Sequence, residues 1–190
     1  MSETKSSSIL PWSFISDKVV YKTPVLDVLE RRVLSPKDGL EKCFTVFKAP
    51  SWVNVLALTE DNLIVMVNQY RHGSRAFSLE LPGGVVEPKD SLETAARREL
   101  LEETGYSAEN FELFLTLNPN PAIFGNGIST FLAKGAKKTG QTHFDPNEET
   151  ELVLVSLADL EKKIVTGEIN HALMLSPLSL FLLKTKSCQK

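Results

Sequence analysis

The clearest secondary-structure element in this sequence is a helix that we expect over residues 91–104. Asp90, with Glu93 three residues later, resembles a capping box, and Gly105 supplies a C-terminal stop. A Pro-Gly-Gly turn at residues 82–84 arrives just before this helix. Glycine lets the backbone approach a neighbouring group closely, so the sequence places a tight turn directly before a well-defined helix.

Short apolar runs bounded by turn residues predict strands on both sides of this helix. Residues 63–67 are apolar at every position, which is typical of a central strand covered on both faces. Residues 18–50 are expected to form an early antiparallel unit with a turn at residues 35–39. The strands are expected at residues 25–34, 43–47, 53–58, 63–68, 77–81, 111–117, 128–133 and 152–155.

Two further helices are expected towards the C-terminus. A short one should open at Ser156, and a longer one at about Asn170, where Pro177 should kink the helix or limit its start. Strands in mixed order with helices on both sides predict the α/β (α+β) class. The expected fold is an α/β/α sandwich with a mixed sheet and no regular βαβ repeat.

The composition excludes several kinds of protein. The formal net charge of -3 and the lack of a basic run argue against a dedicated nucleic-acid binder. Cys43 and Cys188 do not make a disulfide framework, so reduced thiols are the simpler interpretation. The N-terminus has no apolar core of signal-peptide length, and the apolar stretch at residues 173–183 falls short of the roughly 20 residues of a membrane span. We therefore expect a soluble, cytoplasmic protein with neither nucleic acid nor a membrane as partner.

Glu99, Glu102 and Glu103 are spaced to lie on one face of the predicted helix, within a turn of each other. Like charges at this spacing repel, and hard divalent cations such as Mg2+ or Mn2+ relieve the repulsion through oxygen ligands. Arg98 can pair with Glu102 at i+4, and a main-chain carbonyl near Gly83 could complete a metal's coordination shell. An acidic helix face is usually just solvated, but the glycine turn, Arg98 and the helix stop together favour a metal site.

Residues 84–106 resemble the Nudix box. That pattern is a glycine, five residues, Glu, seven residues, Arg-Glu, an aliphatic residue, any residue, Glu-Glu, any residue, Gly and an aliphatic residue. Every spacing matches, but Asp90 stands where the family has glutamate, and Tyr106 where it prefers an aliphatic residue in a buried slot. The role of Asp90, as a metal ligand or only as a helix cap, is therefore open.

The resemblance implies an enzyme that hydrolyses a nucleoside diphosphate linked to some other group. It implies Mg2+ as the cofactor, with Mn2+ as a substitute. Glu102 and Glu103 are then expected to be the principal ligands, and Glu99 to share a second ion. Divalent ions at such a site neutralise the phosphate oxygens and lower the pKa of bound water.

The general base is expected outside the box. In ADP-ribose pyrophosphatases of this superfamily it can come from a mobile acidic loop late in the chain, and the matching stretch here is residues 145–151. Glu148 is the first candidate and Glu149 the second, with a solvated acidic turn as the alternative. Within the box, Arg98 is expected to hold Glu102 in place for catalysis.

Three residues outside the box also resemble features of ADP-ribose pyrophosphatases. Pro121, sixteen residues after Gly105, resembles their proline marker, although a proline in a turn is common. Arg71, in a Gln-Tyr-Arg sequence, is expected to approach the diphosphate, with a structural ion pair as the alternative. Glu80, in a Glu-Leu-Pro-Gly-Gly sequence, is expected to line the site.

A nucleobase needs an aromatic or apolar platform, and related enzymes stack adenine on a tryptophan from a swapped N-terminal segment. Trp12 is the first candidate for this platform and Trp52 the second. Trp52 could equally be part of the core, and Trp12 could be a hydrophobic anchor. The resemblance implies a small N-terminal β-subdomain at residues 1–50 for dimerisation and a catalytic domain at residues 51–190. We therefore expect a homodimer with composite sites for a nucleoside diphosphate sugar.

Two other functions stay open. One is a regulatory Nudix module that binds a nucleotide without cleaving it, against which the intact glutamates argue. The other is a hydrolase of dinucleoside polyphosphates or oxidised triphosphates, against which the N-terminal subdomain and Pro121 count. His72, His143 and His171 lack zinc-ligand spacing and are expected to be polar contacts or surface residues.

Overall fold

The computed structural model describes residues 9–143 and 149–187. The chain divides into two compact units, and each is described here by itself. The N-terminal unit comprises the chain up to Ala49 together with Asn120–Asn126, and the main unit comprises Pro50–Pro119 and the chain from Gly127 onwards. The N-terminal unit is therefore built from two separate segments of the sequence.

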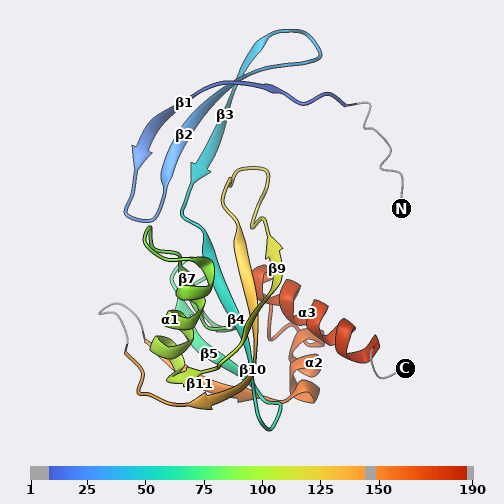
Figure 1. Cartoon of the computed structure of the whole chain (residues 1–190). Coiled ribbons are helices and arrows are strands. Elements are labelled where there is room, and N and C mark those ends of the chain that lie inside the picture. Colours follow the sequence, from blue (N-terminus) through green and yellow to red (C-terminus); the bar gives the residue numbers. More distant parts are fainter. Residues whose placement is uncertain (1–8, 144–148, 188–190) are drawn as a thin grey trace. The chain divides into compact units, whose positions relative to one another are not determined.

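The N-terminal unit is a three-stranded antiparallel sheet in the order β1-β2-β3 (Figure 1). Its strands are β1 (Ser13–Lys22), β2 (Asp27–Leu34) and β3 (Glu41–Lys48). Strands β2 and β3 match the strands predicted at residues 25–34 and 43–47. Strand β1 was not predicted, because its side chains are exposed almost throughout and show no alternation of apolar and polar residues. The 120–126 segment joins this sheet through a backbone hydrogen bond of 2.7 Å from Phe47 N to Ile123 O.

The main unit contains a mixed sheet with the central order β11-β5-β4-β10-β8. Strands β4 and β10 are parallel and the other pairs are antiparallel. Strand β6 pairs with β5, β7 with β4, and β9 with β10. The bounds are β4 (Trp52–Thr59), β5 (Ile64–Arg71), β6 (Ala76–Glu80), β7 (Gly83–Val85), β8 (Tyr106–Ser107), β9 (Phe111–Leu117), β10 (Ile128–Lys138) and β11 (Thr150–Val155).

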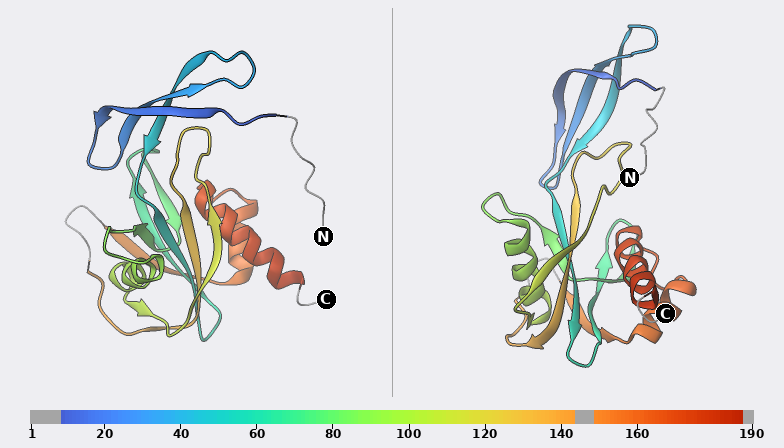
Figure 2. Two further views of the ribbon diagram at one scale, coloured as in Figure 1. Left: turned by 45° about the horizontal axis from the view of Figure 1, so that its top comes forward. Right: turned by 45° about the vertical axis from the view of Figure 1, so that its right-hand side comes forward.

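Helices cover both faces of this sheet (Figure 2). Helix α1 (Leu92–Thr104) packs on one face, and α2 (Leu157–Val165) and α3 (Ala172–Ser187) pack on the other. The first four residues of β5 are completely buried, as expected for a strand covered on both sides. The predicted α/β sandwich is thus confirmed, and no helix in the described part of the chain is long and apolar enough to cross a membrane.

One prediction about helix ends needs correction, and one of the two alternatives for Pro177 is excluded. The N-cap of α1 is Ser91, whose side chain accepts a hydrogen bond from the Thr94 amide; the capping box predicted on Asp90 does not form. Helix α3 continues through Pro177, which lies well inside it and does not limit its start. The predicted stop of α1 is confirmed, since Gly105 adopts a left-handed conformation with φ of 72°.

Candidate active site

Arg98 of helix α1 lies among three carboxylates of residues 84–106. Its Nη1 is 2.9 Å from both Glu99 Oε1 and Glu102 Oε2, and its Nε is 3.4 Å from Asp90 Oδ2. Its Nη2 also donates to the carbonyl of Val85, 3.2 Å away. Burial alone would lower the pKa of Arg98, but Glu99 and Glu102 raise it above its ordinary value. Arg98 therefore connects the turn to the helix and gathers the carboxylates around one cation.

The glycine turn packs directly against the glutamates of α1. The Gly83 amide donates a hydrogen bond of 2.9 Å to Glu103 Oε2, and Glu103 is 5% exposed. A Cβ built on Gly84 would lie 2.6 Å from Glu99 Oε1, so a side chain at this position would displace the Glu99 carboxylate. The turn therefore packs on the acidic helix face, and their role as one metal site stays a prediction.

The residues of this site fit a divalent cation by their donor chemistry. Glu99, Glu102 and Glu103 supply carboxylate oxygens from consecutive turns of one helix, which are the ligands that hard cations prefer. Within residues 9–143 and 149–187, no three acidic, His or Cys side chains converge as a metal centre. The nitrogen of Arg98 stands between Glu99 and Glu102 instead, so a metal ion would share these two carboxylates with a guanidinium.

Arg71 and Glu80 form an ion pair across the hairpin of β5 and β6. Nε and Nη2 of Arg71 donate to the two carboxylate oxygens of Glu80, at 2.8 and 2.7 Å. The Glu80 side chain is 1% exposed, whereas that of Arg71 is 47% exposed. Burial alone would raise the pKa of Glu80, yet the hydrogen bonds from Arg71 and the proximity of His171 lower it to about 2. The structural ion pair named as an alternative for Arg71 is therefore present, and the guanidinium is its exposed partner.

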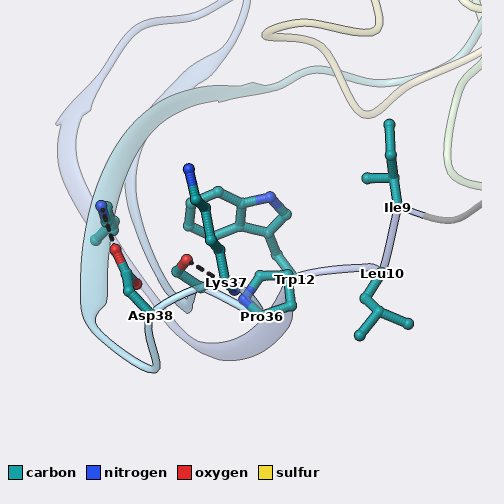
Figure 3. Close-up of a pocket in the computed structure, with 8 residues that line it drawn as sticks. Ile9, Leu10, Trp12, Pro36, Lys37 and Asp38 are labelled. Carbon is teal, nitrogen blue, oxygen red and sulfur yellow. Dashed lines mark hydrogen bonds and ion pairs between the residues drawn. The ribbon is translucent and has the colours of Figure 1, made fainter.

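Trp12 lies in the N-terminal unit, beside a pocket of about 570 Å3 (Figure 3). Its ring is 45% exposed and meets Phe44 edge-on, with the ring centroids 5.5 Å apart. The pocket is lined by Ile9, Leu10, Trp12, Ser35, Pro36, Lys37, Asp38 and Lys42. Lys42 in this wall pairs with Asp38 at 3.2 Å, and the assignment of Trp12 to a nucleobase stays a prediction.

The remaining predicted site residues occupy three different places. Pro121 is exposed in a turn of the 120–126 segment, which belongs to the N-terminal unit. Glu148 lies outside the described residues, and Glu149 is exposed immediately before β11. Their roles, like that of the Gly83 carbonyl as a metal ligand, stay predictions.

The main unit is thus an α/β sandwich that presents an acidic helix face behind a glycine turn. A family model described as NUDIX domain matches residues 49–175, and the chain belongs to that family. Hydrolases of this family depend on a divalent metal.

Several known proteins are similar to this chain. ADP-ribose pyrophosphatase of Bacillus subtilis (strain 168) is 29% identical over 159 residues, which cover 83% of this chain and 85% of that protein. Methanol dehydrogenase activator of Bacillus methanolicus is 34% identical over 113 residues, which cover 59% of this chain and 61% of the activator. A crystal structure of an ADP compounds hydrolase shares the fold, with a TM-score of 0.80 at 21% identity, covering 95% of this chain and 96% of that chain.

Sequence reasoning missed two contacts of this site. Asp90 lies beside Arg98 and does not cap the helix. The sequence alone does not show which residue is the cap, because Asp90 and Ser91 are both favourable N-cap residues. His171 lies 3.3 Å from Glu80, although the two are far apart in the sequence. No periodicity or spacing in the chain signals that second contact.

Proposed function

We propose that this protein hydrolyses the pyrophosphate bond of ADP-ribose and related nucleoside diphosphate sugars, giving a nucleoside monophosphate and a sugar phosphate. The observation that carries the proposal is the packing of Gly83 and Gly84 against Glu99 and Glu103, with Arg98 between the carboxylates. The similarity to an ADP-ribose pyrophosphatase over most of both chains supports the choice of substrate.

The cofactor of the proposed reaction is Mg2+, with Mn2+ as a substitute. Glu102 and Glu103 are its principal ligands, Glu99 shares a second ion, and the Gly83 carbonyl completes the shell. When bound, the metal neutralises the diphosphate oxygens and lowers the pKa of a water molecule. The protein itself fixes the positions of the carboxylates: Arg98 holds Glu99 and Glu102, and the Gly83 amide holds Glu103.

The general base of the proposed reaction is Glu148, with Glu149 as the second candidate. Two contacts at the edges of this acidic stretch support the choice. The His143 amide donates to the Glu102 carbonyl at 2.8 Å, and Thr150 Oγ1 lies 3.5 Å from the Glu103 carbonyl. Both described flanks of the stretch therefore contact the helix that carries the proposed metal ligands, which supports a general base from this part of the chain.

Substrate recognition in this proposal uses Arg71, Trp12 and Pro121. The half-exposed guanidinium of Arg71 takes the diphosphate, because a planar fork of N–H donors matches phosphate oxygens, and Glu80 acts through it. Trp12 stacks on the nucleobase, and Pro121 shapes a loop of the sugar site. The pocket beside Trp12, with Lys37 and Lys42 in its wall, supports the assignment of Trp12 to the nucleobase.

We further propose a cytoplasmic homodimer that forms through the N-terminal unit. Within the described part of this unit, only Leu29 and Val33 are buried apolar side chains. Strand β1 instead exposes large apolar residues, among them Phe14 at 63% and Tyr21 at 66%. A three-stranded sheet with so small a core gains stability by burying such a face, and a second copy offers a matching one.

The activity is tested by incubating the purified protein and Mg2+ with ADP-ribose, ADP-glucose, GDP-mannose and a dinucleoside polyphosphate. Release of phosphatase-sensitive products from the first two, with the loss of most turnover in Glu103→Gln, is expected. A Glu103→Gln variant with the full rate would overturn the metal assignment. Sedimentation velocity on the same sample measures the oligomeric state, and a monomer at all concentrations would overturn the dimer.

A regulatory role is the second candidate, because the chain resembles a methanol dehydrogenase activator. Such a protein would bind the nucleotide and act on another enzyme without needing turnover. The same incubation distinguishes the two: nucleotide binding by calorimetry with no product from any substrate favours the regulator. The intact carboxylate face of α1 favours the hydrolase.

A further inference from the structure

The start of helix α3 reaches the ion pair between Arg71 and Glu80. His171 immediately precedes this helix, and its Nδ1 lies 3.3 Å from Glu80 Oε2. The Nδ1 atom is buried and has no hydrogen bond of regular geometry within the described residues. A buried ring nitrogen this close to a carboxylate needs only a small rotation to donate to it, and this interaction satisfies both groups.

One carboxylate oxygen of Glu80 lies close to both Arg71 and His171. Oε2 is 2.7 Å from Arg71 Nη2 and 3.3 Å from His171 Nδ1, while Oε1 accepts from Arg71 Nε. A carboxylate with both oxygens engaged has a fixed plane, and the plane of the paired guanidinium follows from it. Arg71 is the exposed member of the pair, so a second contact that holds the Glu80 carboxylate also limits the orientation of the guanidinium.

Another contact joins the start of α3 to the end of β6. The amide of Leu81, the residue after Glu80, donates to the sulfur of Met174 at 3.0 Å, and both residues are buried. Met174 lies in the first turn of α3 and belongs to the same apolar cluster as Leu81. The start of α3 is thus tied to the end of β6 at two neighbouring points, through His171 and through Met174.

We propose that His171 is a positioning residue, which orients the Arg71 guanidinium towards the substrate diphosphate by holding the Glu80 carboxylate. This inference rests on the proposed function, since it takes Arg71 as the group that binds the diphosphate. His171 itself does not touch the reacting atoms. Its loss should therefore weaken substrate binding more than it slows the chemical step.

The test is a double-mutant cycle on ADP-ribose hydrolysis with Mg2+, using His171→Ala, Arg71→Ala and the double variant. His171→Ala is expected to raise KM about tenfold with kcat changed less than about twofold, as for the loss of a hydrogen bond to a charged group. In the Arg71→Ala background the same substitution should have no further effect, because the guanidinium that it orients is gone. Asn170→Ala, at the exposed neighbouring position, is the matched control and should leave both constants unchanged.

Two conservative variants give an independent readout. In His171→Asn the amide nitrogen can occupy the place of Nδ1, so this variant should keep most of the activity that His171→Ala loses. In His171→Gln the amide lies one bond further out, so this variant should not keep that activity. Thermal unfolding of each variant shows whether α3 has kept its packing. The inference would be overturned if His171→Ala still raised KM in the Arg71→Ala background. It would also be overturned if the rise in KM followed the loss of thermal stability in every variant. A wild-type protein without turnover would instead refute the proposed function.

Discussion

The buried carboxylate of Glu80 makes a quantitative prediction about stability and pH. Glu80 has a pKa of about 2 in the folded protein against an ordinary value of 4.5. At about 1.4 kcal/mol per pKa unit, this difference corresponds to about 3 kcal/mol of stability at neutral pH. Since Arg71 is 47% exposed and screened by solvent, we expect about 2 kcal/mol in practice.

The sign follows from the lowered pKa of Glu80. The stabilisation is fully present above pH 4.5, where the carboxylate is ionised in both states, and is lost as the pH falls towards 2. Glu80→Gln removes the titrating group and destabilises the protein at pH 7. The difference between wild type and variant should therefore shrink by about 1 kcal/mol or more between pH 7 and pH 3.

Urea unfolding followed by circular dichroism at pH 7, 5, 4 and 3 measures this difference. Glu93→Gln is the matched control, because Glu93 pairs with Arg97 on the exposed surface of α1, with side chains 49% and 40% exposed. We expect the control to change stability by less than about 0.5 kcal/mol at every pH. A Glu80→Gln difference that stays constant with pH, or that is as small as the control at pH 7, would refute the reasoning.

Three further predictions concern the acidic helix and its turn. Ser91→Ala removes the N-cap of α1 and should lower the free energy of unfolding by about 1 kcal/mol in urea titrations, whereas Asp90→Ala should leave the cap intact. Gly84→Ala places a methyl group 2.6 Å from Glu99 Oε1, so kcat should fall by about tenfold or more while the circular dichroism spectrum is retained; an unchanged kcat would contradict the close approach. Chelation with EDTA should abolish turnover and added Mg2+ restore it, and activity that survives prolonged dialysis against EDTA would exclude a divalent metal.

The sequence predicted those parts of the fold that depend on local patterns. The stop of α1 at Gly105 and the double burial at the start of β5 follow from conformational preference and hydrophobic pattern, and both are confirmed. Strand β1 was missed because neither of its faces is covered, which leaves no periodic pattern in its residues. Of the two effects expected of Pro177, a limit on the start of α3 is wrong, because the burial of Met174 and Leu178 outweighs one lost backbone hydrogen bond; the kink stays a prediction.

The site was predictable to the extent that its members share one short segment. The carboxylates of α1, Arg98 and the glycine turn lie within residues 83–103, so helical spacing was enough to group them. The contact between His171 and Glu80 depends on how α3 returns to the end of β6, which is a property of the tertiary packing. Long-range contacts of this kind leave no mark in a single sequence.

The two-segment construction of the N-terminal unit has a practical consequence for any attempt to cut the protein. Residues 120–126 are bonded to β3 through Phe47, and the ring of Phe124 lies against that of Phe47, with centroids 5.2 Å apart. A protease that nicks the chain near Pro50 would thus leave the N-terminal fragment held by a non-covalent contact, and the two fragments should co-elute until a denaturant is added. Deleting the first 49 residues would strip this loop of its pairing strand and leave Phe124 without its ring partner. A minimal version of the enzyme must therefore shorten the loop as well as the N-terminus.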